Sequence, residues 1–423
     1  MHQRVGIEAM AVALPKRHLS MEDLAVARGV DPAKLAVGLG AREMAVADPG
    51  EDTVALAATA AARLVRAHGI DVSRIGMLAV GTETGVDHSK AVASYVQGLL
   101  ELPRAMRTFD TQHACYGGTA ALMAAADWIA SGSANGSAAI VVCSDVARYG
   151  IGTPGEPTQG GGAVAMLVSD RPELLELDRG TNGFFSTDVH DFWRPLGRRE
   201  AVVDGHYSIQ CYLDAVAGAY RMWRSKALER EIVVPSLGLT SEQLARIVYH
   251  VPFCKMARKA HLHLRRCDLE DREHGLLDPM TMAEEEKAGP LSFERQVAPS
   301  LLLPARIGNT YTAALYFGLA SLLHAQAEQL AGKRIGLFSY GSGCSSEFFS
   351  GVVGSRAREI IARAELDDVI EHRVRIDIAE YERIMQLASD APLDEEAPPN
   401  GFRFAGFVGD RRTYNRGCSS GTV

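Results

Sequence analysis

The sequence predicts an α/β fold of two similar halves, with helices buried near the centre. Nearly continuous apolar runs that end in polar clusters recur along the chain, a pattern typical of parallel strands buried on both faces. Helical patterns alternate with these runs, which favours helices packed against a mostly parallel sheet. The 423 residues, 47% hydrophobic and 23% charged, are enough for a substantial core.

The first helix and strand are predicted within residues 51–85. Residues 51–69 show a helical spacing of apolar positions, with Thr53 at the start and Gly69 just past the end. The apolar run that follows, "SRIGMLAVGTETG", indicates a buried strand with a polar exit. Glu83 lies at that exit.

A second helix is predicted from residue 116 to about 131, after "RTFDTQHAC". Its glycines and alanines make it small on every face, as expected of a helix packed in the centre of the molecule. Further strands are predicted in "SAAIVVCSDVARYG" and "GGGAVAMLVSD", residues 137–150 and 160–170.

The same design recurs in the second part of the chain, which predicts an internal duplication. Residues 74–85 correspond to 246–253, and residues 138–147 correspond to 334–343. The similarity is between two large structural units, and it is not the short repeat period of a solenoid.

The duplication predicts two halves, residues 1–170 and 171–423. Two segments of the second half depart from the pattern. Residues 267–300 are acidic and poorly periodic, which predicts a surface excursion. Residues 389–402 are rich in proline and acid, which predicts a linker before the end piece "RFAGFVGDRRTYNR".

Composition favours a cytoplasmic protein. No apolar run reaches membrane-spanning length, and "MHQRVGIEAMAVALPK" is too broken by charge for a signal peptide. Seven cysteines, an odd number without a CxxC pair, argue against a disulfide framework. The net charge of −8 predicts no general attraction to nucleic acid or to an anionic membrane.

Candidate site residues gather where the predicted strands end, because ligands of open α/β sheets bind beyond the carboxyl ends of the strands. These residues, with Asn309 from a loop-to-helix step, are Glu83, Cys115, Tyr149, His250, Asn309 and Ser342. A thiol, a carboxylate and an imidazole can supply a nucleophile and acid–base groups.

Cys115 has two interpretations at this point. A helix start lowers a thiol pKa and so favours a nucleophilic thiolate. A buried structural cysteine is the commoner case, and the local pattern leaves the two even. The other six cysteines are interpreted as structural: Cys143, Cys211, Cys254, Cys267, Cys344 and Cys418.

Glu83 and His250 are ambiguous on their own. Glu83 could be a solvated loop acid or a partly desolvated base, and His250 could be a core histidine. The basic run after His250 could be a solvated helix face or a phosphate-binding patch. His261 and His263 with Cys267 form only a weak metal pattern, so no metal site is predicted.

Eight stretches together resemble the 3-hydroxy-3-methylglutaryl-CoA synthase family of the thiolase superfamily, in its bacterial mevalonate-pathway form. They run in order from residue 30 to 343 and are "VDPAKLAVGLGAREMAV", "GTETGVDHSK", "HACYGG", "ARYGIGTPGEPTQGGGAVAM", "DFWRP" with "VVDGHYSIQCYL", "YHVPFCKMARKA", "RIGNTYTAALY" and "GLFSYGSG". The 267–300 segment and the tail carry little of this resemblance.

The resemblance implies a thiolase-like fold, a homodimer and an acyl transfer without metal or redox cofactor. Cys115 would be acetylated by acetyl-CoA, and Glu83 would remove a proton from the acetyl methyl group. His250, helped by Asn309, would polarise the ketone of acetoacetyl-CoA. The N–H groups of Cys115 and Ser342 would face the enolate oxygen. Water would then release 3-hydroxy-3-methylglutaryl-CoA.

The family's other contacts also transfer onto this sequence. Tyr149 and Thr158 would line the acyl pocket. The residues implied to bind CoA are Asp31, Lys34, Ser208, Lys255 and Lys259.

Two alternatives stay open. One is the homologous synthase of polyketide β-branching, which acts on acyl-carrier-protein thioesters and would make the carrier protein a partner. The other is a non-catalytic thiolase-like subunit that only binds acyl thioesters.

Overall fold

The computed structural model describes residues 4–198, 200–273, 275 and 277–418. A ten-stranded mixed sheet carries the fold. Across the sheet, its strands are β12 (Arg246–Tyr249), β13 (Arg334–Gly341), β14 (Ser345–Val353), β8 (Leu175–Leu177), β1 (Gly6–Ala13), β7 (Gly161–Ser169), β6 (Ala138–Val146), β4 (Ile75–Gly81) and β5 (Arg107–Thr111), with β9 (Gly183–Ser186) beside β14.

The two sides of this sheet repeat each other. β4 pairs with β6 in parallel and β6 pairs with β7 antiparallel. In the same way, β12 pairs with β13 in parallel and β13 pairs with β14 antiparallel. The two sides join where β8 pairs with β1. The predicted correspondence of strands between the halves is therefore confirmed, while the boundary at residue 170 stays a prediction.

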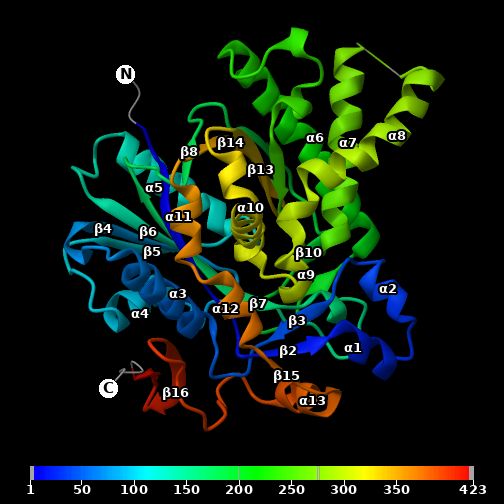
Figure 1. Cartoon of the computed structure of the whole chain (residues 1–423). Coiled ribbons are helices and arrows are strands. Elements are labelled where there is room, and N and C mark those ends of the chain that lie inside the picture. The colour runs from blue at the N-terminus through cyan, green and yellow to red at the C-terminus, as the bar shows by residue number, and fades with distance from the viewer. Residues whose placement is uncertain (1–3, 199, 274, 276, 419–423) are drawn as a thin grey trace.

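Helices lie on both faces of the sheet (Figure 1). α3 (Thr53–His68) packs on β1, β6 and β7. The side chain of Asp52 caps its start, and Gly69, with φ of 57°, ends it in the left-handed conformation that glycine adopts readily. This is the helix that the spacing of residues 51–69 predicts.

Two central helices, α5 (Gly117–Ala130) and α10 (Ala314–Leu330), are largely buried. Thr119 of α5 bonds Tyr316 of α10 at 2.8 Å and Ser339 of β13 at 2.7 Å. A Cβ atom on Gly118 would lie 2.5 Å from the sulfur of Cys143, so only glycine allows this approach of α5 to the sheet. The small-residue pattern correctly predicts a central helix here.

Further elements surround this core. They are α1 (Met21–Ala27), α2 (Pro32–Ala36), α4 (Val92–Leu99), α6 (Gly205–Glu229), α7 (Cys254–Arg272), α8 (Pro279–Gln296), α9 (Pro304–Ile307), α11 (Ala357–Ala362), α12 (Leu366–Glu371), α13 (Ile378–Gln386) and a small sheet of β15 (Val374–Arg375), β2 (Arg17–Ser20) and β3 (Glu43–Val46).

The 267–300 segment, predicted as a poorly periodic surface excursion, is helical despite its weak periodicity, because α7 and α8 form a helical pair there. A Cβ on Gly289 of α8 would lie 2.7 Å from the Leu262 side chain, so this glycine allows the two helices to approach. Arg265, only 4% exposed, bonds Glu285 across the pair at 2.6 Å. The acidic residues and Pro290 inside α8 conceal the periodicity.

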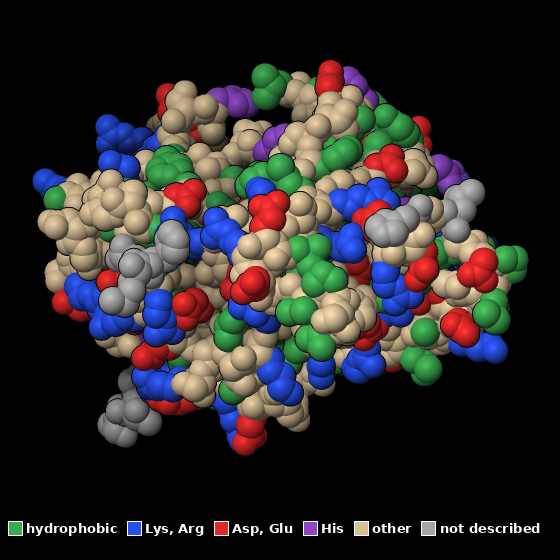
Figure 2. Space-filling model, turned by 90° about the horizontal axis from the view of Figure 1, so that it is seen from above, with side chains coloured by type: hydrophobic (Ala, Val, Ile, Leu, Met, Phe, Trp, Pro, Cys, Tyr) green, Lys and Arg blue, Asp and Glu red, His purple; other side chains and the backbone are tan. Residues whose placement is uncertain are grey.

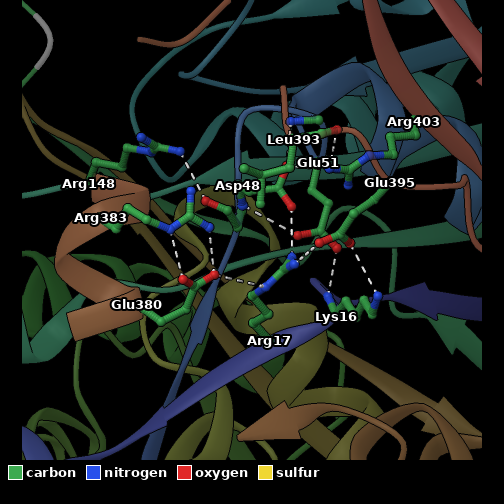
Figure 3. Close-up of polar contacts among 12 residues, drawn as sticks. Lys16, Arg17, Asp48, Glu51, Arg148, Glu380, Arg383, Leu393, Glu395 and Arg403 are labelled. Carbon is green, nitrogen blue, oxygen red and sulfur yellow. Dashed lines mark hydrogen bonds and ion pairs between the residues drawn. The ribbon is translucent and has the colours of Figure 1, made fainter. Parts of the chain in front are cut away.

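The C-terminal tail returns to the first half of the chain. β16 (Phe402–Val408) and β17 (Arg411–Arg416) form a hairpin beside α3, and the Phe404 N–H donates to Gly50 O at 2.8 Å. Arg17 and Arg403 each bind Asp48 at 2.8 Å (Figure 3). Glu395, in the predicted linker, bonds Lys16 and Arg17. Ion pairs thus attach both linker and hairpin.

The surface has no dominant sign of charge on the face seen in Figure 2, where Lys and Arg side chains alternate with Asp and Glu. Within the described ranges, no helix combines the length and the apolar character that crossing a bilayer requires.

Candidate active site

A cavity of about 810 Å³ brings most of the predicted site residues together. Its wall is built from strand ends and loops of both halves and also includes Leu39, Phe192, Tyr311 and Tyr340. The predicted residues that line it are Cys115, Tyr149, Thr158, Ser208, His250, Asn309 and Ser342.

Cys115 and Glu83 are in direct contact, and each is 9% exposed. The Cys115 thiol donates to Glu83 Oε1 across 3.3 Å. Glu83 comes two residues after β4, and Cys115 comes two residues before α5. The adjacent parallel strands β4 and β5 therefore deliver the two side chains to one point.

A helix start would lower the pKa of the Cys115 thiol, but the surroundings of this pair act in the opposite direction. Burial, then the charge of Glu83, raises the pKa of the Cys115 thiol well above its usual range. Burial and the nearby Asp145 raise the pKa of Glu83 to about 8. The resting pair is thus a thiol beside a poorly acidic carboxyl group, and Glu83 is poised near neutral pH to exchange a proton.

Asp145 is a residue of this site that sequence reasoning missed. Its Oδ1 accepts from the Glu83 N–H at 2.9 Å and from the Thr82 hydroxyl at 2.8 Å. Its Oδ2 accepts from the Thr312 N–H at 3.0 Å. One buried carboxylate therefore holds the Glu83 loop against the loop before α10. An acidic residue inside the apolar run of β6 was the feature of the sequence that could have pointed to Asp145.

His250 follows β12 directly and is 2% exposed. Its backbone N–H donates to Phe338 O at 2.8 Å, and the Tyr212 hydroxyl donates to its backbone carbonyl oxygen at 2.5 Å. Burial lowers the pKa of His250 to about 3, so the imidazole is neutral at physiological pH. A neutral imidazole can donate one N–H to a substrate oxygen.

Asn309, Thr158 and Tyr149 form a connected wall of the cavity. Asn309 Oδ1 accepts from the Tyr311 N–H at 2.9 Å, which fixes the amide. The Asn309 N–H donates to Thr158 O at 2.9 Å. Tyr149 is buried, and its N–H donates to Gln159 Oε1 at 3.2 Å.

Ser342 lies in the turn after β13, and Asp191 holds this turn. The Gly343 N–H donates to Asp191 Oδ1 at 2.9 Å, and the Tyr340 hydroxyl donates to Oδ2 at 2.5 Å. Asp191 is fully buried. The contact spans about 150 positions in sequence, so local pattern gave no signal for it.

Of the five predicted CoA-binding residues, Ser208 lines the cavity, and the other four belong to two helices, α2 and α7. Asp31 caps α2 by accepting from the Ala33 N–H at 2.9 Å, and Lys34 lies exposed within α2. Lys255 and Lys259 are in the first turns of α7. The loop after α2 meets the start of α7 at the rim, where the Lys255 N–H donates to Leu39 O at 3.0 Å.

The weak metal pattern does not form one cluster. His261 is fully buried between the Tyr249 hydroxyl and Ser292, at 3.2 and 3.1 Å. His263 contacts Cys267 instead, at 3.6 Å. Among the residues whose placement is described, no three His, Cys, Asp or Glu side chains are arranged to hold a metal ion.

Comparisons with known proteins point to one family. The model "Hydroxymethylglutaryl-coenzyme A synthase N terminal" matches residues 1–172, and the corresponding C-terminal model matches residues 175–402. Hydroxymethylglutaryl-CoA synthase of Enterococcus faecalis is 34% identical, covering 92% of this chain and 94% of that protein. The mitochondrial synthase of Homo sapiens is 38% identical, covering 82% and 73%.

Solved structures agree in fold. MvaS in complex with 3-hydroxy-3-methylglutaryl coenzyme A is 63% identical, with a TM-score of 0.96 over 99% of this chain and 100% of that chain. The curacin-pathway HMG synthase is 30% identical, with a TM-score of 0.84 over 98% and 100%. The predicted thiolase-like fold is confirmed, and the chain belongs to the hydroxymethylglutaryl-CoA synthase family.

Proposed function

We propose that this chain condenses acetyl-CoA with acetoacetyl-CoA, the activity of its family, through an acetylated Cys115. The thiol displaces CoA from acetyl-CoA and forms a thioester. Glu83 removes a proton from the acetyl methyl group, and the resulting carbanion attacks the ketone of acetoacetyl-CoA. Water then cleaves the thioester, which releases 3-hydroxy-3-methylglutaryl-CoA and restores the thiol.

The contact between Cys115 and Glu83 is the observation that carries this proposal. A base that lies 3.3 Å from the thiol also lies close to any acyl group on that sulfur. Its raised pKa, about 8, makes it a stronger base than an ordinary glutamate.

His250 and Asn309 are proposed to hold the ketone oxygen of the second substrate. Both line the cavity that contains Cys115, and the neutral imidazole offers one N–H donor and carries no charge. The N–H groups of Cys115 and Ser342 are proposed to face the enolate oxygen, where donors stabilise developing charge.

CoA is proposed to extend past Ser208 towards the rim formed by the loop after α2 and the start of α7. Lys34, Lys255 and Lys259 would meet its phosphates there, and Asp31 would shape the start of α2. The tyrosine and threonine of the acyl pocket, Tyr149 and Thr158, would close around the small acyl group.

We further propose a homodimer and a cytoplasmic location. β5 ends the strand order, and a second copy would pair with this edge of the sheet. The seven cysteines are free thiols, a state typical of a reducing compartment.

The activity is tested with purified protein, acetyl-CoA and acetoacetyl-CoA. The expected result is CoA release and formation of 3-hydroxy-3-methylglutaryl-CoA, measured by a thiol reagent and by mass spectrometry. Turnover that begins only when acetoacetyl-carrier protein is supplied would assign the chain to β-branching. Substrate binding without acetylation or turnover would identify a non-catalytic subunit.

The 63% identity to MvaS favours the free CoA substrates over the carrier-bound ones. The curacin-pathway synthase, whose solved structures include complexes with a donor carrier protein, is 29–30% identical. The carrier-protein reaction therefore remains the second candidate.

A further inference from the structure

Residues 191–198 and 200–204 belong to a strap that connects the two sides of the active site. The strap contains the short strands β10 (Phe192–Trp193) and β11 (Val202–Val203), which pair antiparallel. At its base, the Asp204 N–H donates to Asp191 O at 3.1 Å. The carboxylate of Asp191 is bound to the Tyr340–Gly343 turn, so the strap is anchored in the second half of the chain.

Arg194 extends from this strap to the catalytic loop of the first half. Its Nη2 donates to the carbonyl oxygen of Glu83. Arg194 and Thr84 line a second cavity, of about 440 Å³, and Tyr311 lines both cavities. Glu83 therefore lies between Cys115 at the first cavity and Arg194 at the second.

The groups that face Glu83 are mostly anionic or neutral. Asp145 of β6 binds its N–H, and Cys115 binds its carboxylate. Tyr149 and Tyr311 interact electrostatically with it from their own loops. Among the described groups that act on the Glu83 carboxylate, Arg194 supplies the positive charge.

We infer that Arg194 is a positioning residue for Glu83, which it holds in place by its backbone carbonyl so that the carboxylate meets Cys115 and the acyl group on it. This inference rests on the proposed function, in which Glu83 is the base. The Glu83 backbone is then held at both polar atoms, the N–H by Asp145 and the carbonyl by Arg194. With both contacts in place, the backbone from which the carboxylate extends towards the thiol is fixed.

Removing the guanidinium should have two effects. A base displaced by about 1 Å loses on the order of 100-fold in rate, so condensation should slow by about 10- to 100-fold. The lost positive charge should also make the carboxylate harder to ionise, and the pH at which condensation reaches half its maximum should rise.

The experiment compares the wild type with Arg194→Gln, Arg194→Lys and, as a control for lost surface charge, Arg66→Gln on α3. Condensation by the acetylated enzyme is measured across pH, and melting temperature checks folding. Arg194→Gln should lower kcat and move the midpoint of the pH–rate profile to higher pH. Arg194→Lys should restore most of both, and Arg66→Gln should match the wild type. Arg194→Met replaces Arg194→Gln if the latter melts early.

If the pH midpoint of condensation is unchanged in Arg194→Gln and Arg194→Met, the inference is overturned, whatever happens to the rate. A wild type without synthase activity would instead refute the proposed function. Hydrogen–deuterium exchange of the peptide around residues 82–86 then decides the role of Arg194 without turnover. Faster exchange in Arg194→Gln but not in Arg194→Lys supports the inference, and equal exchange in all variants overturns it.

Discussion

At the scale of single residues, the contact of Cys115 with Glu83 explains how a buried thiol could become a nucleophile without being a resting thiolate. Desolvation and the adjacent carboxylate both disfavour thiolate. Glu83, with a pKa of about 8, can take the thiol proton as the sulfur attacks an acyl carbon. Once it has passed this proton to the departing CoA sulfur, the same carboxylate is beside the acetyl methyl group.

Cys115→Ala should abolish covalent acetylation by labelled acetyl-CoA, because the sulfur is the atom that forms the thioester. Glu83→Ala should acetylate slowly, because the thiol loses the base that takes its proton, and should fail to condense, with condensation reduced by about 100- to 10,000-fold as for the loss of a general base. Intact-protein and peptide mass spectrometry measure the label. Cys418→Ala, which removes an exposed cysteine, is the matched control and should acetylate normally. Label on the Cys115→Ala variant would disprove the assignment.

Condensation should depend on pH through Glu83. A base acts in its deprotonated form, and the raised pKa places half-deprotonation near pH 8. The rate at saturating substrates should therefore rise between pH 7 and pH 9, not between pH 4 and pH 5 as for an ordinary glutamate. A pH–rate profile of the acetylated enzyme checks this. A flat profile above pH 6 would contradict it.

At the scale of elements, Asp145 at the end of β6 joins the loops that carry Glu83 and Thr312. Asp145→Asn should lower stability by roughly 2–3 kcal/mol, because an amide cannot accept at both of the positions used now. Asp145 raises the pKa of Glu83, so the substitution should also move the pH midpoint of condensation downward. This is the opposite direction from Arg194→Gln. Thermal melts and pH profiles of the two variants test both statements.

The sequence predicts the strands better than it predicts the connections between them. The strands β4, β6, β12 and β13 are apolar runs with polar exits, and the structure places them as expected. α8 is hidden because Gly289 and Pro290 interrupt its pattern. Its place depends on the contact of Gly289 with Leu262, which lies on another helix.

In the site, too, residues at strand ends are predicted better than residues that act through long-range contacts. Glu83, Cys115 and His250 stand at strand ends, where local pattern can point to them. Asp191 and Arg194 act through contacts about 110 to 150 residues away in sequence, which periodicity does not encode. The direction in which the pKa of the Cys115 thiol is shifted could not be predicted from the sequence either, because burial and the charge of Glu83 determine it.

At the scale of the whole molecule, the C-terminal tail ties the end of the chain to its beginning. Arg403→Met should lower stability by about 3 kcal/mol, because it breaks the buried ion pair of Arg403 with Asp48. Arg411→Met, an exposed change in the same hairpin, should be neutral. Chemical denaturation measures both. Equal stability of the two variants would show that the hairpin does not depend on this pair.

The junction between tail and first half should also make stability depend on pH. Burial, then the charge of Asp48, raises the pKa of Glu51 to about 7, while Arg403 and Arg17 act in the opposite direction. The folded chain then keeps a proton that the unfolded chain releases near its ordinary pKa of 4.5. This contribution to stability is complete at low pH and is lost as the pH rises towards 7.

Glu51→Gln should flatten this dependence, since glutamine keeps an acceptor for the Lys16 N–H and does not ionise. Its melting temperature relative to the wild type should be higher at pH 8 than at pH 5. Glu396→Gln, an exposed change in the neighbouring tail, should show no such difference. The same offset at both pH values would mean that Glu51 titrates as an ordinary carboxylate and that the junction is not sensitive to pH.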